Sequence, residues 1–353
     1  MMNLVMTAPV PASADLEVIG KAARLHYEYG LTHQEVADVL HVSRVKVTRL
    51  LKQARDLGIV QIRVLPDVSP YAGLEMELAN RFNLDEAIVV PTMADDLDQR
   101  RALAVAAARY LQRVLHHGMT VAIGLSRTVA LIPQYVVDPR PANATFVSLV
   151  GGMRRYAIAA NPYEGAERLA QLFGGTAEHL LAPAIAGSPA IAEAFFADPG
   201  TVRTLERAAS ADLALLGIAA TDDHTTLVDE DELTSDEISS LIESGAVGDT
   251  AARFFDANGA SVTHEIDSRI IGLTLTQIRQ IPLRIVVAGG ISKTEALRGA
   301  LRGGLAAVVV LDAQTAQQVL GEPFKKGRRQ MQRAGETQDP KPKGAQSKKT
   351  KGS

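Results

Sequence analysis

The segment HVSRVKVTRLLKQAR, residues 41–55, contains five basic side chains and no acidic one, although the whole chain carries a formal net charge of −3. If residues 44–57 form a helix, one of its faces is apolar and the opposite face is cationic. Arg and Lys side chains on an exposed helix face can bind DNA phosphates or the O6 and N7 atoms of guanine. The segment therefore predicts a helix that enters the DNA major groove. The alternative is an ordinary amphipathic helix with a solvated basic face.

The residues expected to contact DNA lie on this helix and at the start of the helix before it. The cations are expected to reach bases or phosphates, and the hydroxyl and amide side chains to bind the DNA backbone. The full set is Thr32, Gln34, Ser43, Arg44, Val45, Lys46, Thr48, Arg49 and Lys52. The apolar face, made of Val47, Leu50, Leu51, Ala54 and Leu57, is expected to pack on the two preceding helices.

Local signals place the basic helix third in a group of three. Residues 15–30 read as a helix that Gly30 ends, and residues 32–40 as a helix that opens with a capping box. Ser43 is the expected N-cap of the third helix, which Gly58 ends. Three short helices with a tight turn before the third are typical of a helix-turn-helix DNA-binding unit. The alternating, β-rich residues 59–66 predict a strand that forms a wing.

A second group of candidate residues lies in three glycine-containing turns that follow apolar, β-rich runs. Such turns meet at the carboxyl ends of parallel strands, where open α/β sheets bind ligands. Free backbone N–H groups and a nearby cation in each turn favour an acidic or phosphorylated ligand. The alternative is that the glycines serve only to connect strand and helix. The candidates are Gly124, Ser126, Arg127 and Thr128 in IGLSRT, Gly151 and Gly152 in VGGMRR, and Gly289, Gly290 and Lys293 in VAGGISK.

The elements that position these turns follow from residue 74 onward. Short apolar runs such as AIVVP, TVAIG, TFVSLV, ADLALLGI, RIVVAGG and AAVVVLD alternate with amphipathic stretches of helical period. This alternation predicts an α/β, Rossmann-like domain with a mostly parallel sheet covered by helices on both faces. The predicted organisation is a DNA-binding domain at 15–65, a linker at 66–73 and an effector domain at 74–322, with disordered ends at 1–14 and 323–353.

Composition limits the remaining possibilities. The 353 residues include no cysteine, which excludes disulfides, thiolate metal sites and cysteine nucleophiles. No apolar run approaches the roughly 20 residues of a membrane helix, and no signal-peptide pattern is present, so we expect a cytoplasmic protein. Residues 64–322 hold 19 Lys/Arg against 32 Asp/Glu, whereas residues 323–353 hold ten against two. The basic tail would add non-specific affinity for DNA or act only as a solubility tail.

Several motifs further resemble those of one protein family. The segment YEYGLTHQEVADVLHVSRVKVTRLLKQARDLGIVQIRV, and later LVGGM, GAVGDTAARFFDANG, IVVAGGISKTEALRGALRGG and LDAQTAQQVL, resemble the SorC family of bacterial sugar-responsive transcriptional regulators. Within that family the pattern is especially similar to the regulators of autoinducer-2 operons. The likeness spans roughly residues 16–321. It implies a DeoR-like effector domain similar to sugar-phosphate isomerases, and homodimers or homotetramers on double-stranded operator DNA.

The resemblance also implies two pocket residues. Asp249 and Lys293 occupy positions that line the sugar-phosphate pocket in similar domains, although an interior salt bridge between them is the alternative. The loop GLSRTVA, residues 124–130, departs from the family pattern because it lacks the second glycine of a phosphate-binding loop. The expected effector is therefore a sugar, a polyol or a sugar phosphate.

The function predicted from the sequence is a DNA-binding transcriptional regulator of a carbohydrate-utilisation operon, controlled by that effector. No catalytic residue, metal site or cofactor is expected. The alternative is an enzyme similar to sugar-phosphate isomerases with a DNA-binding appendage, in which Asp249 or Lys293 would act as the base.

Overall fold

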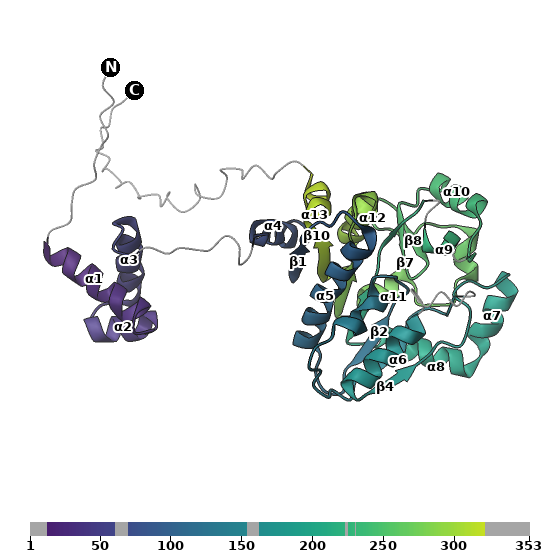
Figure 1. Ribbon diagram of the computed structural model, residues 1–353, viewed down its shortest axis with the longest axis horizontal. Helices are drawn as coiled ribbons and strands as arrows, with labels where there is room; N and C mark the ends of the chain where they lie inside the picture. The colour runs from purple at the N-terminus through teal and green to yellow at the C-terminus, as the bar shows by residue number, and fades with distance from the viewer. Residues whose placement is uncertain (1–12, 61–69, 154–161, 223–224, 230, 322–353) are drawn as a thin grey trace, which may run out of the picture. The chain divides into compact units, whose positions relative to one another are not determined.

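The computed structural model describes residues 13–60, 70–153, 162–222, 225–229 and 231–321 (Figure 1). The chain divides into two compact units, with the division between Pro70 and Tyr71. The expected wing strand lies mostly, and the C-terminal tail wholly, outside the described residues. The second half of the expected linker, residues 70–73, is described, and a helix already begins within it at Ala72. The first helix begins at Ser13, which lies inside the segment expected to be disordered.

The N-terminal unit consists of α1 (Ser13–Tyr27), α2 (His33–Leu40) and α3 (Arg44–Asp56). These are the three predicted helices, although α1 ends three residues before Gly30. Their shared core is small and aliphatic, and consists of Ile19, Ala22, Ala23, Val36, Ala37, Val47, Leu50, Leu51 and Ala54. Leu57 was expected in this core but is the C-cap of α3 and is 44% exposed. The packing face therefore ends one turn earlier than the helical period predicted.

Local hydrogen bonds fix the start of α2 and the turn between α2 and α3. The Thr32 hydroxyl accepts a hydrogen bond from the Glu35 amide, and the Glu35 carboxylate accepts from the Thr32 amide, so the predicted capping box is present. His41 ends α2 in the left-handed conformation with a φ of 53°, and the Ser43 hydroxyl accepts from the Lys46 amide to begin α3. Asn and His are among the non-glycine residues that tolerate this conformation best.

The larger unit is built on a seven-stranded sheet. All its pairings are parallel, and its strand order is β1-β10-β9-β5-β2-β3-β4. The mostly parallel α/β fold predicted from the sequence is confirmed. The strands are β1 (Glu86–Val90), β2 (Thr120–Ile123), β3 (Thr145–Ser148), β4 (Thr176–Glu178), β5 (Leu213–Leu216), β9 (Leu283–Val287) and β10 (Val308–Asp312).

Helices cover both faces of this sheet (Figure 1). Since successive strand residues point to opposite faces, Ala214 and Leu216 of β5 enter one core cluster, while Leu213 and Leu215 enter another. The described α-helices are α4 (Ala72–Phe82), α5 (Asp96–Val114), α6 (Pro162–Phe173), α7 (Pro189–Ala197), α8 (Pro199–Ala209), α9 (Thr226–Asp229), α10 (Ser235–Glu243), α11 (Leu275–Gln280), α12 (Thr294–Arg302) and α13 (Ala313–Leu320). The 3₁₀ segments include η2 (Val129–Tyr135) and η4 (Ile291–Lys293).

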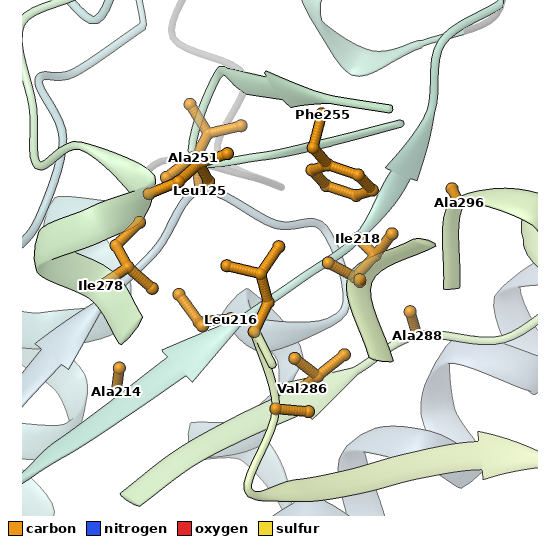
Figure 2. Packing of buried hydrophobic residues seen from close by; sticks show 14 of the residues in the cluster. Leu125, Ala214, Leu216, Ile218, Ala251, Phe255, Ile278, Val286, Ala288 and Ala296 are labelled. Atoms are coloured by element: carbon orange, nitrogen blue, oxygen red, sulfur yellow. The ribbon is translucent and has the colours of Figure 1, made fainter. Parts of the chain in front are cut away.

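A second, three-stranded antiparallel sheet was not predicted. It joins β6 (Ala219–Ala220), β7 (Gly248–Thr250) and β8 (Arg253–Phe255). The hairpin between β7 and β8 turns through Ala251 and Ala252, whose φ values are 52° and 64°. Figure 2 shows Phe255 of this sheet and Ile218 in the core cluster that also holds Leu216 and Val286, which pair across β5 and β9.

Candidate functional site

The first candidate site is the exposed face of α3 in the N-terminal unit. All nine residues predicted to contact DNA are exposed. Val45 is 71% exposed, which is unusual for a large apolar side chain and leaves its methyl groups available for contact. Within the part of the chain that the structure describes, Arg44, Lys46, Arg49 and Lys52 form no ion pair. Their charges are therefore not neutralised by the protein itself.

The polar members of this set hold the backbone in place. The Thr32 hydroxyl accepts from the Glu35 amide and donates to the Glu35 carboxylate. The Thr32 backbone N–H also donates to that carboxylate, and this bond first, then the bond from the hydroxyl, lowers the pKa of Glu35. The Thr48 hydroxyl donates to the Arg44 carbonyl at 3.2 Å, and the Gln34 side-chain amide donates to Asp38 at 2.9 Å. These hydrogen bonds fix the start of α2 and two side chains along α2 and α3.

The second candidate site is a cavity of about 180 Å³ in the larger unit. It lies at the carboxyl ends of the parallel strands, between β2 and β5, which are neighbours in the sheet. The chain leaves β2 toward β3 and leaves β5 toward β9, so the crossovers diverge here and open a crevice. The lining residues are Asp96, Arg100, Leu125, Ser126, Arg127, Thr128, Gly217, Ile218, Ala219, Ala220, Asp222, Thr225, Leu227, Asp249, Ser292 and Lys293.

Five residues predicted from the sequence meet in this cavity: Ser126, Arg127, Thr128, Asp249 and Lys293. They come from the loop after β2, from β7 and from η4. Their positions in the sequence are far apart, and the convergence of the strand ends brings them together. The volume suits a ligand smaller than a typical drug-sized molecule, whose pockets span roughly 300–1,000 Å³.

Asp249 is the most buried charged residue of the cavity, with 5% exposure. Its Oδ2 accepts a hydrogen bond from the Ala252 amide at 3.2 Å, and within the described residues its buried Oδ1 has no hydrogen-bond partner. Burial raises the pKa of Asp249 to about 7, against the opposing effects of the Ala252 N–H and of Lys293. The hydrogen-bonding capacity of Oδ1 is thus unused among the described residues.

Lys293 is partly buried. Burial lowers its pKa, and Arg100 and Arg127 lower it further by charge repulsion, while the charges of Asp96 and Asp222 act in the opposite direction. The alternative of a salt bridge between Asp249 and Lys293 is wrong for the described structure, in which the two groups do not form an ion pair within 4 Å. The ammonium therefore faces the cavity with no protein carboxylate paired to it among the described residues.

The two arginines of the cavity are both paired. Arg127 donates to the Asp229 carboxylate at 2.6 Å, and Arg100 forms an ion pair with Asp96 one turn earlier on α5. Neither guanidinium brings a full uncompensated charge to a ligand.

The remaining predicted glycines do not line the cavity, and close packing accounts for them. A Cβ atom on Gly151 would lie 2.4 Å from the Pro183 carbonyl oxygen, and one on Gly152 would lie 2.8 Å from the Tyr163 ring. A Cβ atom on Gly124 would meet the Leu215 carbonyl oxygen at 3.1 Å, and one on Gly289 would meet Asp312 at 2.7 Å. Gly290 has a φ of 104° and donates to Asp312 and Thr315.

Sequence reasoning missed two parts of the wall. Asp96 and Arg100 begin α5, which follows β1, and residues 217–220 follow β5. The run ADLALLGI was recognised as a strand, and the rule that ligands bind beyond the carboxyl ends of parallel strands applies to it as well. Applying that rule to Gly217 would have found the turn that faces Ser126.

Other classes of site are not seen in the described ranges. In those ranges no three His, Cys, Asp or Glu side chains are grouped as metal ligands. No described helix combines the length and the apolar character that crossing a bilayer requires.

Comparison with known proteins gives a family match over the described part of the larger unit. The family described as "Putative sugar-binding domain" matches residues 67–321. The erythritol catabolism regulatory protein EryD of Brucella abortus (strain 2308) is 29% identical over 314 residues, which cover 88% of this chain and 99% of EryD. The transcriptional regulator LsrR of Escherichia coli (strain K12) is 30% identical and covers 86% of this chain and 94% of LsrR.

The similarity extends to a full-length solved structure. The sorbitol operon regulator SorC from Klebsiella pneumoniae aligns with a TM-score of 0.68 and 25% sequence identity, over 88% of this chain and 100% of SorC. A match that includes the whole of a full-length regulator spans both compact units of this chain.

Proposed function

Because the chain belongs to the sugar-binding domain family of transcriptional regulators, we propose that it is a DNA-binding regulator of a carbohydrate-utilisation operon. Its effector is a sugar, a polyol or a sugar phosphate that binds in the cavity between β2 and β5. The relatives named for erythritol catabolism and for a sorbitol operon support this class of effector. The observation that carries the proposal is the row of exposed cations on α3, unpaired among the described residues, in the same chain as this cavity.

The residues divide into two functional groups. Arg44, Lys46, Arg49 and Lys52 bind phosphates and base edges of the operator, and Val45 contacts a base from within the groove. In the proposed organisation residues 15–65 form the DNA-binding domain, 66–73 the linker and 74–322 the effector domain. The protein works in the cytoplasm as a homodimer or homotetramer, so that paired helices read a partly palindromic operator.

Effector and operator are coupled through the subunit arrangement. A ligand that weakens operator binding must itself bind the DNA-bound protein less tightly, by the same factor. The basic segment 323–353 adds sequence-independent affinity for DNA.

One observation favours a second function. A buried carboxyl group with a pKa of about 7 inside a cavity suits a general base, as an isomerase of sugar phosphates would need. We expect no such activity, since the exposed cationic face of α3 would serve no purpose in an isomerase. Purified protein incubated with aldose and ketose phosphates should show no interconversion; turnover that Asp249→Asn abolishes would establish the enzyme instead.

The regulator is tested by fluorescence anisotropy with duplexes from the DNA upstream of its own coding region. We expect tight binding to at least one duplex, and release or tightening on addition of a sugar or polyol from a screened panel. The same compound should raise the melting temperature of the free protein by mass action. Binding that is equal for all duplexes, and indifferent to every compound that raises the melting temperature, would contradict the proposal.

A further inference from the structure

The charge of the cavity is nearly balanced before any ligand enters. Arg127 is paired with Asp229 and Arg100 with Asp96, so Lys293 is the one lining cation without a carboxylate partner among the described residues. Asp249 adds a further carboxyl group to the same wall. A phosphate dianion would be desolvated here with a single free cation to compensate it, and carboxylates close by would repel it.

Backbone donors at the start of η2 are already used. The Ser126 hydroxyl oxygen accepts hydrogen bonds from the amides of Thr128 at 3.2 Å and of Val129 at 3.3 Å. N–H groups of this kind bind phosphate oxygens when they face a ligand. In this loop a side chain of the protein takes the place that an anion would occupy.

The Ser126 side chain also packs against Gly217, which follows the neighbouring strand β5. A Cβ atom built on Gly217 would lie 2.3 Å from the Ser126 Oγ and 2.4 Å from its Cβ. Since real Cβ atoms do not approach so closely, Ser126 fills the space that the missing side chain leaves. The hydroxyl therefore cannot swing toward β5 to make room for a larger group.

Two polar side-chain groups of the cavity wall are free to form hydrogen bonds with a ligand. Asp249 Oδ1 and the Thr225 hydroxyl are buried without a hydrogen-bond partner in the described structure, and both residues line the cavity. A carboxylate oxygen accepts hydrogen bonds, and a threonine hydroxyl both donates and accepts. The hydroxyl groups of a polyol or an unphosphorylated sugar satisfy both.

From these four observations we infer that the cavity takes an uncharged polyhydroxylated ligand, and that Ser126 is the residue that excludes its phosphate esters. The inference rests on the proposed function, because it narrows the class of effector for that same site. Ser126 acts by occupying the amides of Thr128 and Val129, while Asp249 and Thr225 bind the ligand hydroxyls.

The test compares matched pairs of probes on the full-length protein. Erythritol, ribitol and D-ribose, each beside its monophosphate ester, and inorganic phosphate are titrated by calorimetry and by thermal shift. Ser126→Gly frees both amides, and Ser126→Ala does so while it keeps the Cβ atom, in case the glycine variant folds poorly. Ser188→Gly is the matched control, because Ser188 caps α7 with the same type of hydrogen bond, to the Ile191 amide, and does not line the cavity.

We expect the wild-type protein and Ser188→Gly to bind at least one uncharged probe about tenfold more tightly than its ester. A tenfold difference in affinity is about the effect of one hydrogen bond. Both Ser126 variants should bind the ester or inorganic phosphate about tenfold more tightly than wild type.

If the wild type prefers an ester that also releases operator DNA, the inference is wrong and the proposed function stands. An unchanged ester-to-parent ratio in both Ser126 variants overturns the role of Ser126. If no probe binds at all and none affects operator binding, both the inference and the effector part of the proposed function fail.

Discussion

Gly217 and Ser126 face each other across the ends of β5 and β2, so closely that a methyl group on Gly217 would lie 2.3 Å from the Ser126 hydroxyl oxygen. The two residues follow adjacent parallel strands, after which the chain leaves in opposite directions. The Ser126 side chain occupies the space that a side chain at position 217 would need, and this contact limits the width of the crevice.

Gly217→Ala is expected to lower the free energy of unfolding by about 1–3 kcal/mol, because an added carbon in a filled space displaces its neighbours. It should also abolish effector binding. Adding Ser126→Gly to the same chain should restore most of the lost stability, since it removes the atom that collides. Chemical denaturation measures the free energy of unfolding of Gly217→Ala, of Ser126→Gly and of the double variant. Gly73→Ala on α4, where a Cβ atom meets nothing within 4 Å, is the control and should not destabilise. Additive losses in the double variant would contradict the shared space.

Asp249→Asn is expected to flatten the dependence of stability on pH. In the folded protein the pKa of Asp249 is about 7, against an ordinary value of 3.8. Between these values the native state binds more protons than the unfolded state, so this group makes the free energy of unfolding fall as pH rises through the window. Asparagine removes that contribution. The free energy of unfolding, measured by denaturation at several pH values in this window, should fall less steeply with pH for the variant than for the wild type. Equal slopes for the two proteins would show that Asp249 is not buried in solution.

Arg44→Ala together with Arg49→Ala is expected to weaken operator binding by about 100-fold or more, since each lost arginine contact to a base costs about 1–3 kcal/mol. The melting temperature should change little, because both side chains are exposed. Lys21→Ala with Arg24→Ala on α1 removes the same charge from another face and serves as the control. Equal losses for both pairs in an anisotropy titration would mean that only net charge matters.

Lys52→Ala tests whether the last basic residue of the face binds a phosphate. Removal of one phosphate contact should reduce the slope of log K against log salt by about 0.9, with similar losses for operator and unrelated DNA. The slope is obtained from anisotropy titrations at several salt concentrations. A loss confined to the operator would instead assign Lys52 to a base.

Ala252→Gly is expected to stabilise the protein. Ala252 has a φ of 64° in the two-residue turn between β7 and β8, and a non-glycine residue in this conformation costs about 1–2 kcal/mol. Part of the gain is offset by the greater freedom of glycine in the unfolded chain and by the loss of a buried methyl group, so the net increase should be at most about 0.5 kcal/mol. Ala209→Gly, in α8, should have the opposite sign, and equal losses at both sites would disprove strain in the turn.

The parts of the structure that the sequence predicted well are those that local signals specify. Thr32 and Ser43 cap their helices by bonds to residues only three positions away. Six strands of the parallel sheet are visible as apolar runs because both faces of the sheet are covered; they are β1, β2, β3, β5, β9 and β10. Leu57 was placed wrongly because helical period says nothing about where the partner helix ends. The three-residue strands β4, β7 and β8 are too short to produce a run.

The cavity was only partly predictable for a different reason. Ser126, Asp249 and Lys293 were identified by motif, but the pairing of Arg127 with Asp229 and of Arg100 with Asp96 depends on the folded chain. Those two ion pairs decide how much positive charge a ligand meets. The cation in each predicted turn favoured an acidic or phosphorylated ligand, whereas the structure leaves one unpaired lysine among the described lining residues.

Five separate stretches of the chain line this crevice, at Arg100, Ser126, Gly217, Asp249 and Lys293. A molecule bound there therefore acts as a non-covalent cross-link between segments that are remote in sequence. Fraying of any one of these strand ends would release its contacts with the others. Occupancy should consequently slow amide hydrogen exchange across β2, β5 and β9 together, and not only in the loops that touch the ligand.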